Sequence, residues 1–336
     1  MPNFLVSYGL FAAETLTLLI AFAAAFIFVV RVILAARGAH PAEQLEVNSL
    51  NRHFTDTADS LLAEMLDRRE WKRHIKVRAA QDKAKRKAQS GTTAPTRLFV
   101  LDFEGDVAAT QTVALREEIS AILQVATTRD EVLLRLESAG GLVHSYGLAA
   151  SELRRLREHG LKLTIAVDKV AASGGYMMAC VADHIIAAPF AVVGSIGVVA
   201  QLPNFHRLLK KNDIDIELHT AGAYKRTLTM LGENSAAARE KFLAELEDTH
   251  ALFKAFVGEN RPQVAIAEVA TGEHWYGTRA LALKLVDQLK TSDDYILERV
   301  HDHDIFSLRY RRRRSLRERL GGEFTRLATS LAGRFR

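Results

Sequence analysis

The sequence is short of several features that would point to well-known classes of protein. It has a single cysteine, Cys180, in 336 residues, which excludes an intrachain disulfide framework. It has no Walker loop and no Gly-x-Gly-x-x-Gly motif after a predicted strand. The run His301–Asp304 alternates histidine and aspartate, but no second cluster completes a metal site. We therefore expect a buried, unreactive Cys180 and no metal or cofactor.

Positive charge is absent from the first 30 residues, where Glu14 is the single charged residue. About 20 apolar residues are needed to cross a bilayer as a helix, and residues 4–30 supply them. A cleavable signal peptide would start with basic residues; cleavage near residues 35–39 stays an alternative, because small residues occur there. We predict an uncleaved, single-pass membrane anchor over residues 1–38.

A charged segment follows the predicted anchor, over residues 39–96. Apolar residues recur at helical spacing over 43–66, which predicts an amphipathic helix. Residues 68–87 contain ten lysines and arginines, typical of a solvated helical stalk; contact with anionic lipid headgroups is the alternative. Residues 90–96 are rich in turn-forming residues and predict a linker.

The middle of the chain alternates strand and helix patterns. Strands are predicted at 98–103, 132–136 and 163–167, and helices at 111–125, 145–159, 235–258 and 278–286. Such alternation is typical of βαβ units and a largely parallel sheet. The apolar stretch 185–200 contains Pro189 and two glycines, so we expect a buried strand–turn–strand passage there instead of a membrane span. The predicted α/β domain covers residues 97–300.

The remaining residues, 301–336, form a basic tail. Arg311–Arg314 are consecutive, and apolar residues then recur at helical spacing up to Phe335. This pattern predicts a basic amphipathic helix at a membrane surface, with a disordered tail as the alternative. We expect no nucleic-acid partner.

Two residues suggest nucleophilic chemistry. Ser173 lies in the small-residue segment Ala-Ala-Ser-Gly-Gly-Tyr, and Lys225 follows 52 residues later in Ala-Tyr-Lys-Arg. A neutral lysine amine can take the proton of a serine that attacks a carbonyl. Ser173 is equally compatible with a helix N-cap. Lys225 is also compatible with an exposed loop, because it would need burial or a nearby cation such as Arg226 to lose its charge near pH 7.

Acyl transfer also needs donors for the developing oxyanion. The backbone amides of Gly141 and Gly174 are candidates, because each follows a predicted strand, although glycine pairs also serve ordinary tight turns. A serine–histidine pair is the rival arrangement. Its candidate histidines, none of which has an obvious orienting motif, are His144, His184 and His206.

Four segments resemble the SohB-type members of the signal peptide peptidase A family, peptidase family S49. They are KVAASGGYMMACVAD at 169–183, VGSIGVVAQLPNF at 193–205, IDIELHTAGAYKRTLT at 214–229 and ATGEHWYG at 270–277. The resemblance covers about residues 97–300 and implies a ClpP/crotonase-like α/β fold with a serine–lysine dyad. It assigns the nucleophile to Ser173, the general base to Lys225, the residue that orients the lysine to Ser195, and the oxyanion donors to the backbone of Gly141 and Gly174.

The resemblance also carries expectations about assembly and the oxyanion loop. Family members assemble as rings or domes, so we expect a homo-oligomer. The family commonly has Ser-Pro-Gly-Gly where this chain has Ser138-Ala139-Gly140-Gly141. Loss of the proline removes a fixed backbone angle from the loop, which puts its rigidity in question.

We therefore predict a membrane-anchored serine endopeptidase that hydrolyses signal-peptide remnants or other membrane-derived peptides through an acyl-enzyme. The better-known family members place the peptidase domain outside the cytoplasm. The lysines and arginines that follow the anchor favour the cytoplasmic side, and we lean to that side. The alternatives are a non-catalytic oligomeric membrane scaffold and, third, an acyl-CoA-handling crotonase-like enzyme.

Overall fold

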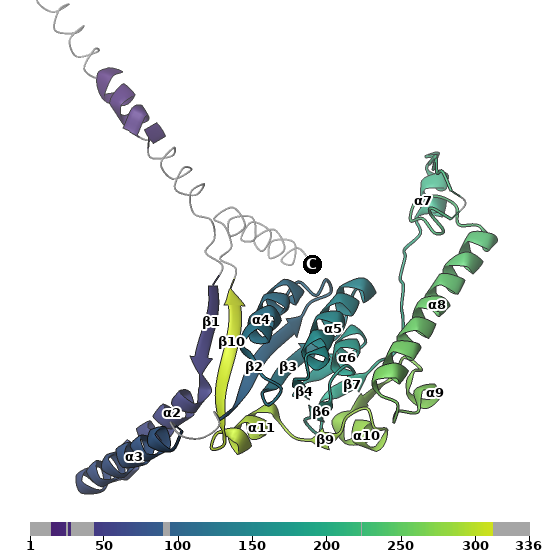
Figure 1. The fold of residues 1–336 in the computed structure, drawn as a ribbon. Coiled ribbons are helices and arrows are strands. Elements are labelled where there is room, and N and C mark those ends of the chain that lie inside the picture. Colours follow the sequence, from purple (N-terminus) through teal and green to yellow (C-terminus); the bar gives the residue numbers. More distant parts are fainter. Residues whose placement is uncertain (1–14, 25, 28–43, 90–94, 223, 312–336) are drawn as a thin grey trace, which may run out of the picture. The chain divides into compact units, whose positions relative to one another are not determined.

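A computed structural model describes residues 15–24, 26–27, 44–89, 95–222 and 224–311 (Figure 1). The chain divides into two units, residues 1–44 with 311–336, and residues 45–310. In the first unit, residues 15–24 and 26–27 are helical. No helix among the described residues is long and apolar enough to cross a bilayer. Most of the predicted anchor, and the predicted tail helix from residue 312, lie outside the described residues.

The second unit is built on a mixed sheet whose strands follow the order β1-β10-β2-β3-β4-β6-β9, with β5, β7 and β8 branching from β3. The strands are β1 (Gln44–Ser49), β2 (Thr96–Gly105), β3 (Glu131–Ser138), β4 (Lys162–Val167), β5 (Val170–Ala172), β6 (His184–Ala187), β7 (Val192–Gly194), β8 (His274–Tyr276), β9 (Gln288–Leu289) and β10 (His303–Arg311). The pairs of β2, β3, β4 and β6 are parallel, which confirms the predicted parallel sheet. The strand–turn–strand passage predicted at 185–200 is present as β6 and β7.

Helices cover both faces of this sheet, because the strands are apolar on both. The helices are α2 (Leu50–Met65), α3 (Arg68–Gln89), α4 (Thr112–Val125), α5 (Val143–Glu158), α6 (Gly174–Ala179), α7 (His206–Lys211), α8 (Ala236–Asn260), α9 (Ile266–Val269), α10 (Gly277–Ala282) and α11 (Ser292–Arg299). Phe99, Leu101 and Phe103 of β2 enter the large core with α4, α5 and α6, which also buries Cys180, as predicted. Leu98 and Val100 point the other way and pack with α11.

Two strands at one edge of the sheet, β1 and β10, lie where the sequence predicted a helix and a tail. The amphipathic helix expected from residue 43 begins only at Leu50, because Leu45 and Val47 alternate with polar residues and form β1. The basic tail expected from residue 301 begins with β10, which pairs with β2 in parallel register. Ile305 and Leu308 of β10 are buried. The free energy gained by their burial is therefore larger than the cost of bringing the neighbouring arginines to this part of the sheet.

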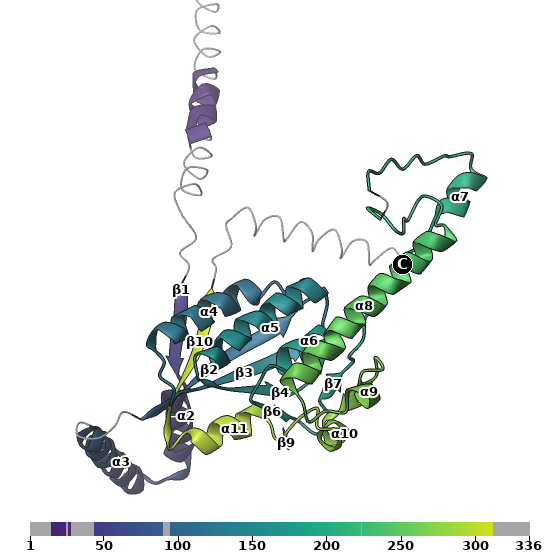
Figure 2. The same ribbon diagram turned by 45° about the vertical axis from the view of Figure 1, so that its right-hand side comes forward.

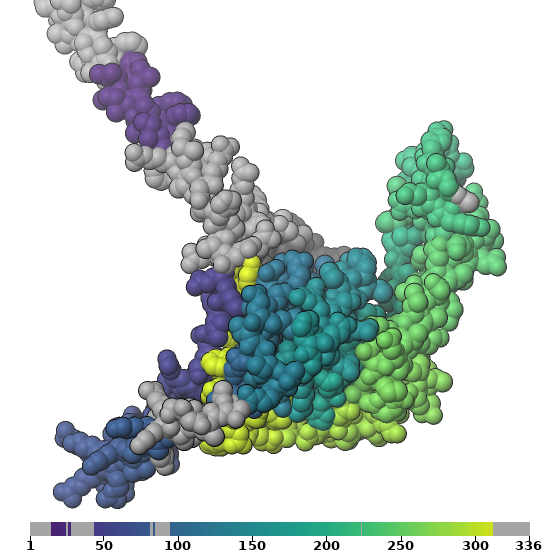
Figure 3. Space-filling view, in the orientation of Figure 1, coloured from purple at the N-terminus to yellow at the C-terminus, as the bar shows by residue number. Residues whose placement is uncertain are grey.

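One segment of the second unit extends away from the core. We define the arm as residues 199–252, which include α7 and the first two thirds of α8 (Figure 2). Of its described residues only Gly232 is buried. The helix α8 enters the core only near its end, through Phe253 and Val257. The arm therefore stands clear of the helices α4, α5 and α6, as the space-filling view shows (Figure 3).

Candidate active site

Ser173 sits on a strained turn between β5 and α6. Its backbone has φ 52° and ψ −119°, a conformation that a residue with a side chain rarely adopts and that costs about 1–3 kcal/mol. Its amide donates to the carbonyl of Gly194 at 2.7 Å, which ties the turn to β7. Ser173 occupies the N-cap position, but its hydroxyl makes no capping hydrogen bond. The Ser173 side chain therefore does not support the helix-cap interpretation. Ser173 is half-buried, and its hydroxyl makes no hydrogen bond to the helix.

The loop after β3 lies directly against this turn. Gly140 has φ +91°, and a Cβ built on it would lie 2.7 Å from the Gly174 nitrogen and 2.8 Å from the Ser173 Cβ. Within the described part of the chain, the amides of Gly141 and Gly174 donate no hydrogen bond to another protein group. The fold therefore brings two uncommitted donors to the segments that surround Ser173, as an oxyanion site requires.

Ser195 directly follows β7, which pairs with β5, the strand that precedes Ser173. Ala172 of β5 is paired with Gly194 of β7 in parallel register, so the two serines leave the same edge of the sheet side by side. Ser195 also has a positive φ, 52°. Its amide donates to the Glu273 carbonyl at 2.7 Å, and its hydroxyl donates to the Gly272 carbonyl at 3.4 Å. The predicted orienting serine is therefore close to the nucleophile's turn.

Lys225 is placed elsewhere, on the arm. It is exposed, and its amide donates to the Gly222 carbonyl at 3.2 Å. The neighbouring Tyr224 ring lies 5.2 Å from Lys241 Nζ of α8, whereas α8 first enters the core at Phe253. Those twelve residues span about 18 Å of helix. Among the described residues no hydrogen bond joins Lys225 to Ser173 or Ser195.

A buried polar group that the sequence analysis overlooked lies beneath the loop after β3. Tyr146 of α5 donates its hydroxyl hydrogen to the Asp106 carbonyl at 2.8 Å and lies 2.5 Å from the Ser138 hydroxyl. Ser138 in turn accepts from the Gly140 amide at 3.0 Å. A possible signal was a tyrosine in an apolar helix face eight residues after Ser138, but helical periodicity alone indicates only packing.

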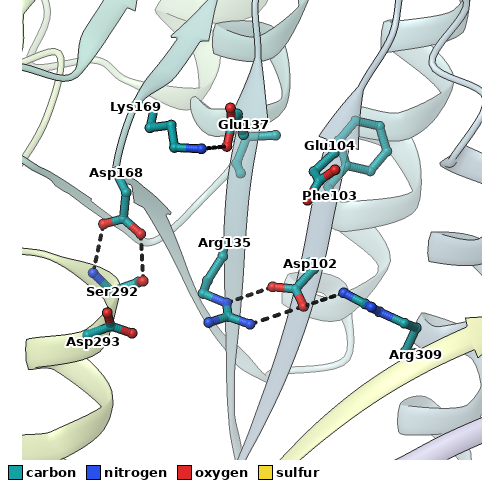
Figure 4. Close-up of a pocket in the computed structure, with 11 residues that line it drawn as sticks. Asp102, Phe103, Glu104, Arg135, Glu137, Asp168, Lys169, Ser292, Asp293 and Arg309 are labelled. Atoms are coloured by element: carbon teal, nitrogen blue, oxygen red, sulfur yellow. Dashed lines mark hydrogen bonds and ion pairs between the residues drawn. The ribbon is translucent and has the colours of Figure 1, made fainter.

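The opposite face of the sheet holds a charged cavity of about 290 Å³ (Figure 4). Arg135 binds Asp102 at 2.6 and 3.0 Å, and Lys169 binds Glu137 at 2.8 Å. Asp168 accepts from the amide and hydroxyl of Ser292. Most of its charged side chains are thus bonded to one another or to Ser292, and neither Ser173 nor Lys225 lines the cavity. This cavity is therefore not the candidate active site.

Comparison with known proteins relates nearly the whole chain to one peptidase family. The model described as "Peptidase family S49 N-terminal" matches residues 3–153, and "Peptidase family S49" matches residues 155–305. "Probable protease SohB" of Haemophilus influenzae is 49% identical over 346 residues, which cover 100% of this chain and 97% of the relative. "Probable protease SohB" of Buchnera aphidicola subsp. Schlechtendalia chinensis is 49% identical over 307 residues, which cover 88% and 100%.

A solved structure is also similar. It is a mutant of the 1510-N membrane-bound stomatin-specific protease in complex with a substrate peptide. The match has a TM-score of 0.43 at 12% identity, and it covers 69% of this chain and 99% of that one.

Proposed function

Because the chain belongs to peptidase family S49 and is a serine-type peptidase, we propose that it is a membrane-anchored endopeptidase with Ser173 as nucleophile and Lys225 as general base. The observation that supports this most directly is the strained turn of Ser173, whose hydroxyl makes no capping hydrogen bond. The turn includes the Gly174 amide and lies against the loop of Gly141, and among the described residues neither amide donates a hydrogen bond to a protein group. A strained strand-to-helix turn of this kind exposes a nucleophile in other hydrolases.

The proposed reaction is acyl transfer through Ser173. Its Oγ attacks the scissile carbonyl while Lys225 Nζ accepts the hydroxyl proton. The amides of Gly141 and Gly174 stabilise the oxyanion. As the C–N bond breaks, Lys225 returns the proton to the leaving amine, and Ser173 is left acylated. Water, deprotonated by Lys225, then releases the acyl group, and Ser195 orients the amine throughout.

The position of the arm leads us to propose that the working site is shared between copies of the chain. Lys225 is carried away from the Ser173 of its own chain, so a second copy supplies it. The arm also exposes apolar side chains that a lone chain leaves in water, including Phe205, Leu208 and Leu218 at 43–59% exposure. Large exposed apolar patches are typical of protein interfaces, and we propose that these side chains contribute to one. A homo-oligomer with a ClpP/crotonase-like subunit fold accounts for both features.

The proposed substrates are signal-peptide remnants or other membrane-derived peptides, and the proposed location is the bacterial inner membrane. Support comes from the apolar segment within residues 1–38 and from the sequence resemblance. We place the catalytic domain on the cytoplasmic side, because basic residues follow the apolar segment. Digestion of intact spheroplasts with an external protease tests this: a cytoplasmic domain is protected until the cells are lysed, and cleavage in intact spheroplasts contradicts the assignment.

Mixed oligomers test the dyad and its sharing together. Ser173→Ala and Lys225→Ala chains are each expected to lose peptide hydrolysis. Co-expressed in one cell, they should regain part of it, because the lysine of the first chain can serve the serine of the second. Activity that persists in Ser173→Ala contradicts the nucleophile. Two inactive variants that stay inactive in confirmed mixed oligomers contradict the shared site.

A further inference from the structure

The buried tyrosine of α5 contacts all three segments that meet at the candidate site. Tyr146 is fully buried, and Ser138 is 2% exposed. The tyrosine hydroxyl reaches Asp106, just after β2, and Ser138, at the end of β3. Its ring lies beneath the nucleophile's turn, since a Cβ built on Gly174 would be 2.4 Å from Tyr146 Cγ. One side chain therefore connects both neighbouring strand ends with the residue after Ser173.

The hydrogens of this network can be assigned, because each hydroxyl has only one. Tyr146 gives its hydrogen to the Asp106 carbonyl, which can only accept. The Ser138 hydroxyl must then donate to the tyrosine oxygen, and it accepts from the Gly140 amide. The result is a directed chain from Gly140 N–H through Ser138 and Tyr146 to the Asp106 carbonyl. We call it the Tyr146 relay.

The relay restrains the backbone of the loop after β3, because it holds the Gly140 amide through Ser138. Gly140 has a positive φ, and glycine itself does little to restrict the backbone of the loop. Gly140 is the residue before the proposed oxyanion donor Gly141, and Leu142 after it is held by the Val107 carbonyl at 2.8 Å. The relay and this second hydrogen bond therefore restrain the residues on either side of Gly141. Burial raises the pKa of Tyr146, so its hydroxyl stays protonated and the relay keeps its direction.

We propose that Tyr146 is a positioning residue for peptide hydrolysis: it holds the amides of Gly141 and Gly174 in register with Ser173. It does not touch the reacting atoms. The inference rests on the proposed function, because it assigns the two amides to the oxyanion. It extends that function to a network of hydrogen bonds that restrains the loop after β3.

The test compares Tyr146→Phe with Tyr295→Phe in the full-length oligomer. Tyr295 is also buried and also bonds a buried hydroxyl, Thr164 Oγ at 3.0 Å, but it lies on the other face of the sheet. Both variants lose one hydroxyl and should lower the melting temperature by similar amounts. Only Tyr146→Phe is expected to lower kcat, by about 10- to 100-fold, because small misplacement of catalytic groups is costly. KM should stay within about two-fold, because the donors act mainly in the transition state.

Equal kcat in the two variants, or a fall in activity that follows only the loss of folded protein, overturns the proposal. If Tyr146→Phe does not fold, Ser138→Ala decides, because it breaks the relay and keeps the ring; wild-type kcat there overturns it. The double variant Ser138→Ala/Tyr146→Phe should be no slower than the slower single variant. Ser173→Ala is measured in parallel. If this variant retains activity, the result contradicts the proposed function, and it does so independently of the role proposed for Tyr146.

Discussion

Ser173 and Gly140 show how single residues shape this site. Each occupies a backbone conformation with positive φ, and the two lie in van der Waals contact across the loop. Ser173 adopts this strained conformation although it carries a side chain, and its hydroxyl makes no capping hydrogen bond to α6. Gly140 permits the close approach of the donor loop. The site thus depends on a side chain at Ser173 and on the absence of one at Gly140.

A pair of glycine substitutions separates these roles. Gly140→Ala places a methyl group 2.7 Å from the Gly174 nitrogen, at φ +91°; we expect a loss of about 1–3 kcal/mol in the free energy of unfolding and a lower kcat. Gly147→Ala, in α5, meets no atom within 4 Å. It should stabilise the protein by about 1 kcal/mol and leave kcat unchanged. Denaturant unfolding and peptide hydrolysis measure both, and equal effects of the two substitutions would contradict the contact.

At the scale of elements, β10 is joined to α4 by a buried carboxyl group. Glu118 of α4 is 3% exposed and accepts from the Tyr310 amide at 2.7 Å. Burial raises its pKa to about 7, although the bond from Tyr310 opposes the shift. The folded state therefore keeps Glu118 protonated at a pH where the unfolded chain has released the proton. This group contributes stability below its unfolded pKa, near 4.5, and loses that contribution as pH rises to about 7.

Glu118→Gln tests this dependence. The free energy of unfolding of the wild type should fall by about 3 kcal/mol between pH 4.5 and 7 on account of Glu118. The glutamine keeps an acceptor for Tyr310 and has no proton to lose, so this part of the fall should vanish. Glu117→Gln, on the exposed side of the same helix, is the control and should follow the wild type. Parallel curves for all three proteins would show that Glu118 titrates normally.

At the scale of the whole molecule, the arm is the feature that supports the proposed association of copies. Its apolar side chains remain in water in a single chain, and it carries the proposed general base away from the proposed nucleophile. In the proposed oligomer, packing against another copy would remove those side chains from water, which favours association. The same packing would bring the Lys225 of one copy to the Ser173 of another.

One charge on the arm should therefore weaken assembly. Leu208 of α7 is 59% exposed, and Leu297 of α11, outside the arm, is 50% exposed. Leu208→Glu is expected to shift the detergent-solubilised protein to smaller species in analytical ultracentrifugation and to lower peptide hydrolysis at least ten-fold. Leu297→Glu should change neither. An unchanged sedimentation profile for Leu208→Glu would contradict the arm as an interface.

The sequence by itself determined the parallel α/β core and the identity of the small-residue loops. Apolar runs of strand length that alternate with helical periodicity admit few other folds, and the predicted strands at 98–103, 132–136 and 163–167 are all present. The family followed from short motifs, because the residue types around Ser173 and Lys225 are specific in combination. The limits of the sheet did not follow, because charged and polar residues within and beside β1 and β10 hide the alternation of apolar residues.

Only the tertiary structure decided how the candidate residues are arranged. Pairing of β5 with β7 sets Ser173 beside Ser195, and the contact of Gly140 with Gly174 sets the donor loop beside both. The long helix α8 separates Lys225 from them. The Tyr146 relay could not be predicted for the same reason, since it bonds a side chain to a backbone carbonyl 40 residues away. Local patterns specify which elements form, whereas long-range register and packing determine which side chains meet.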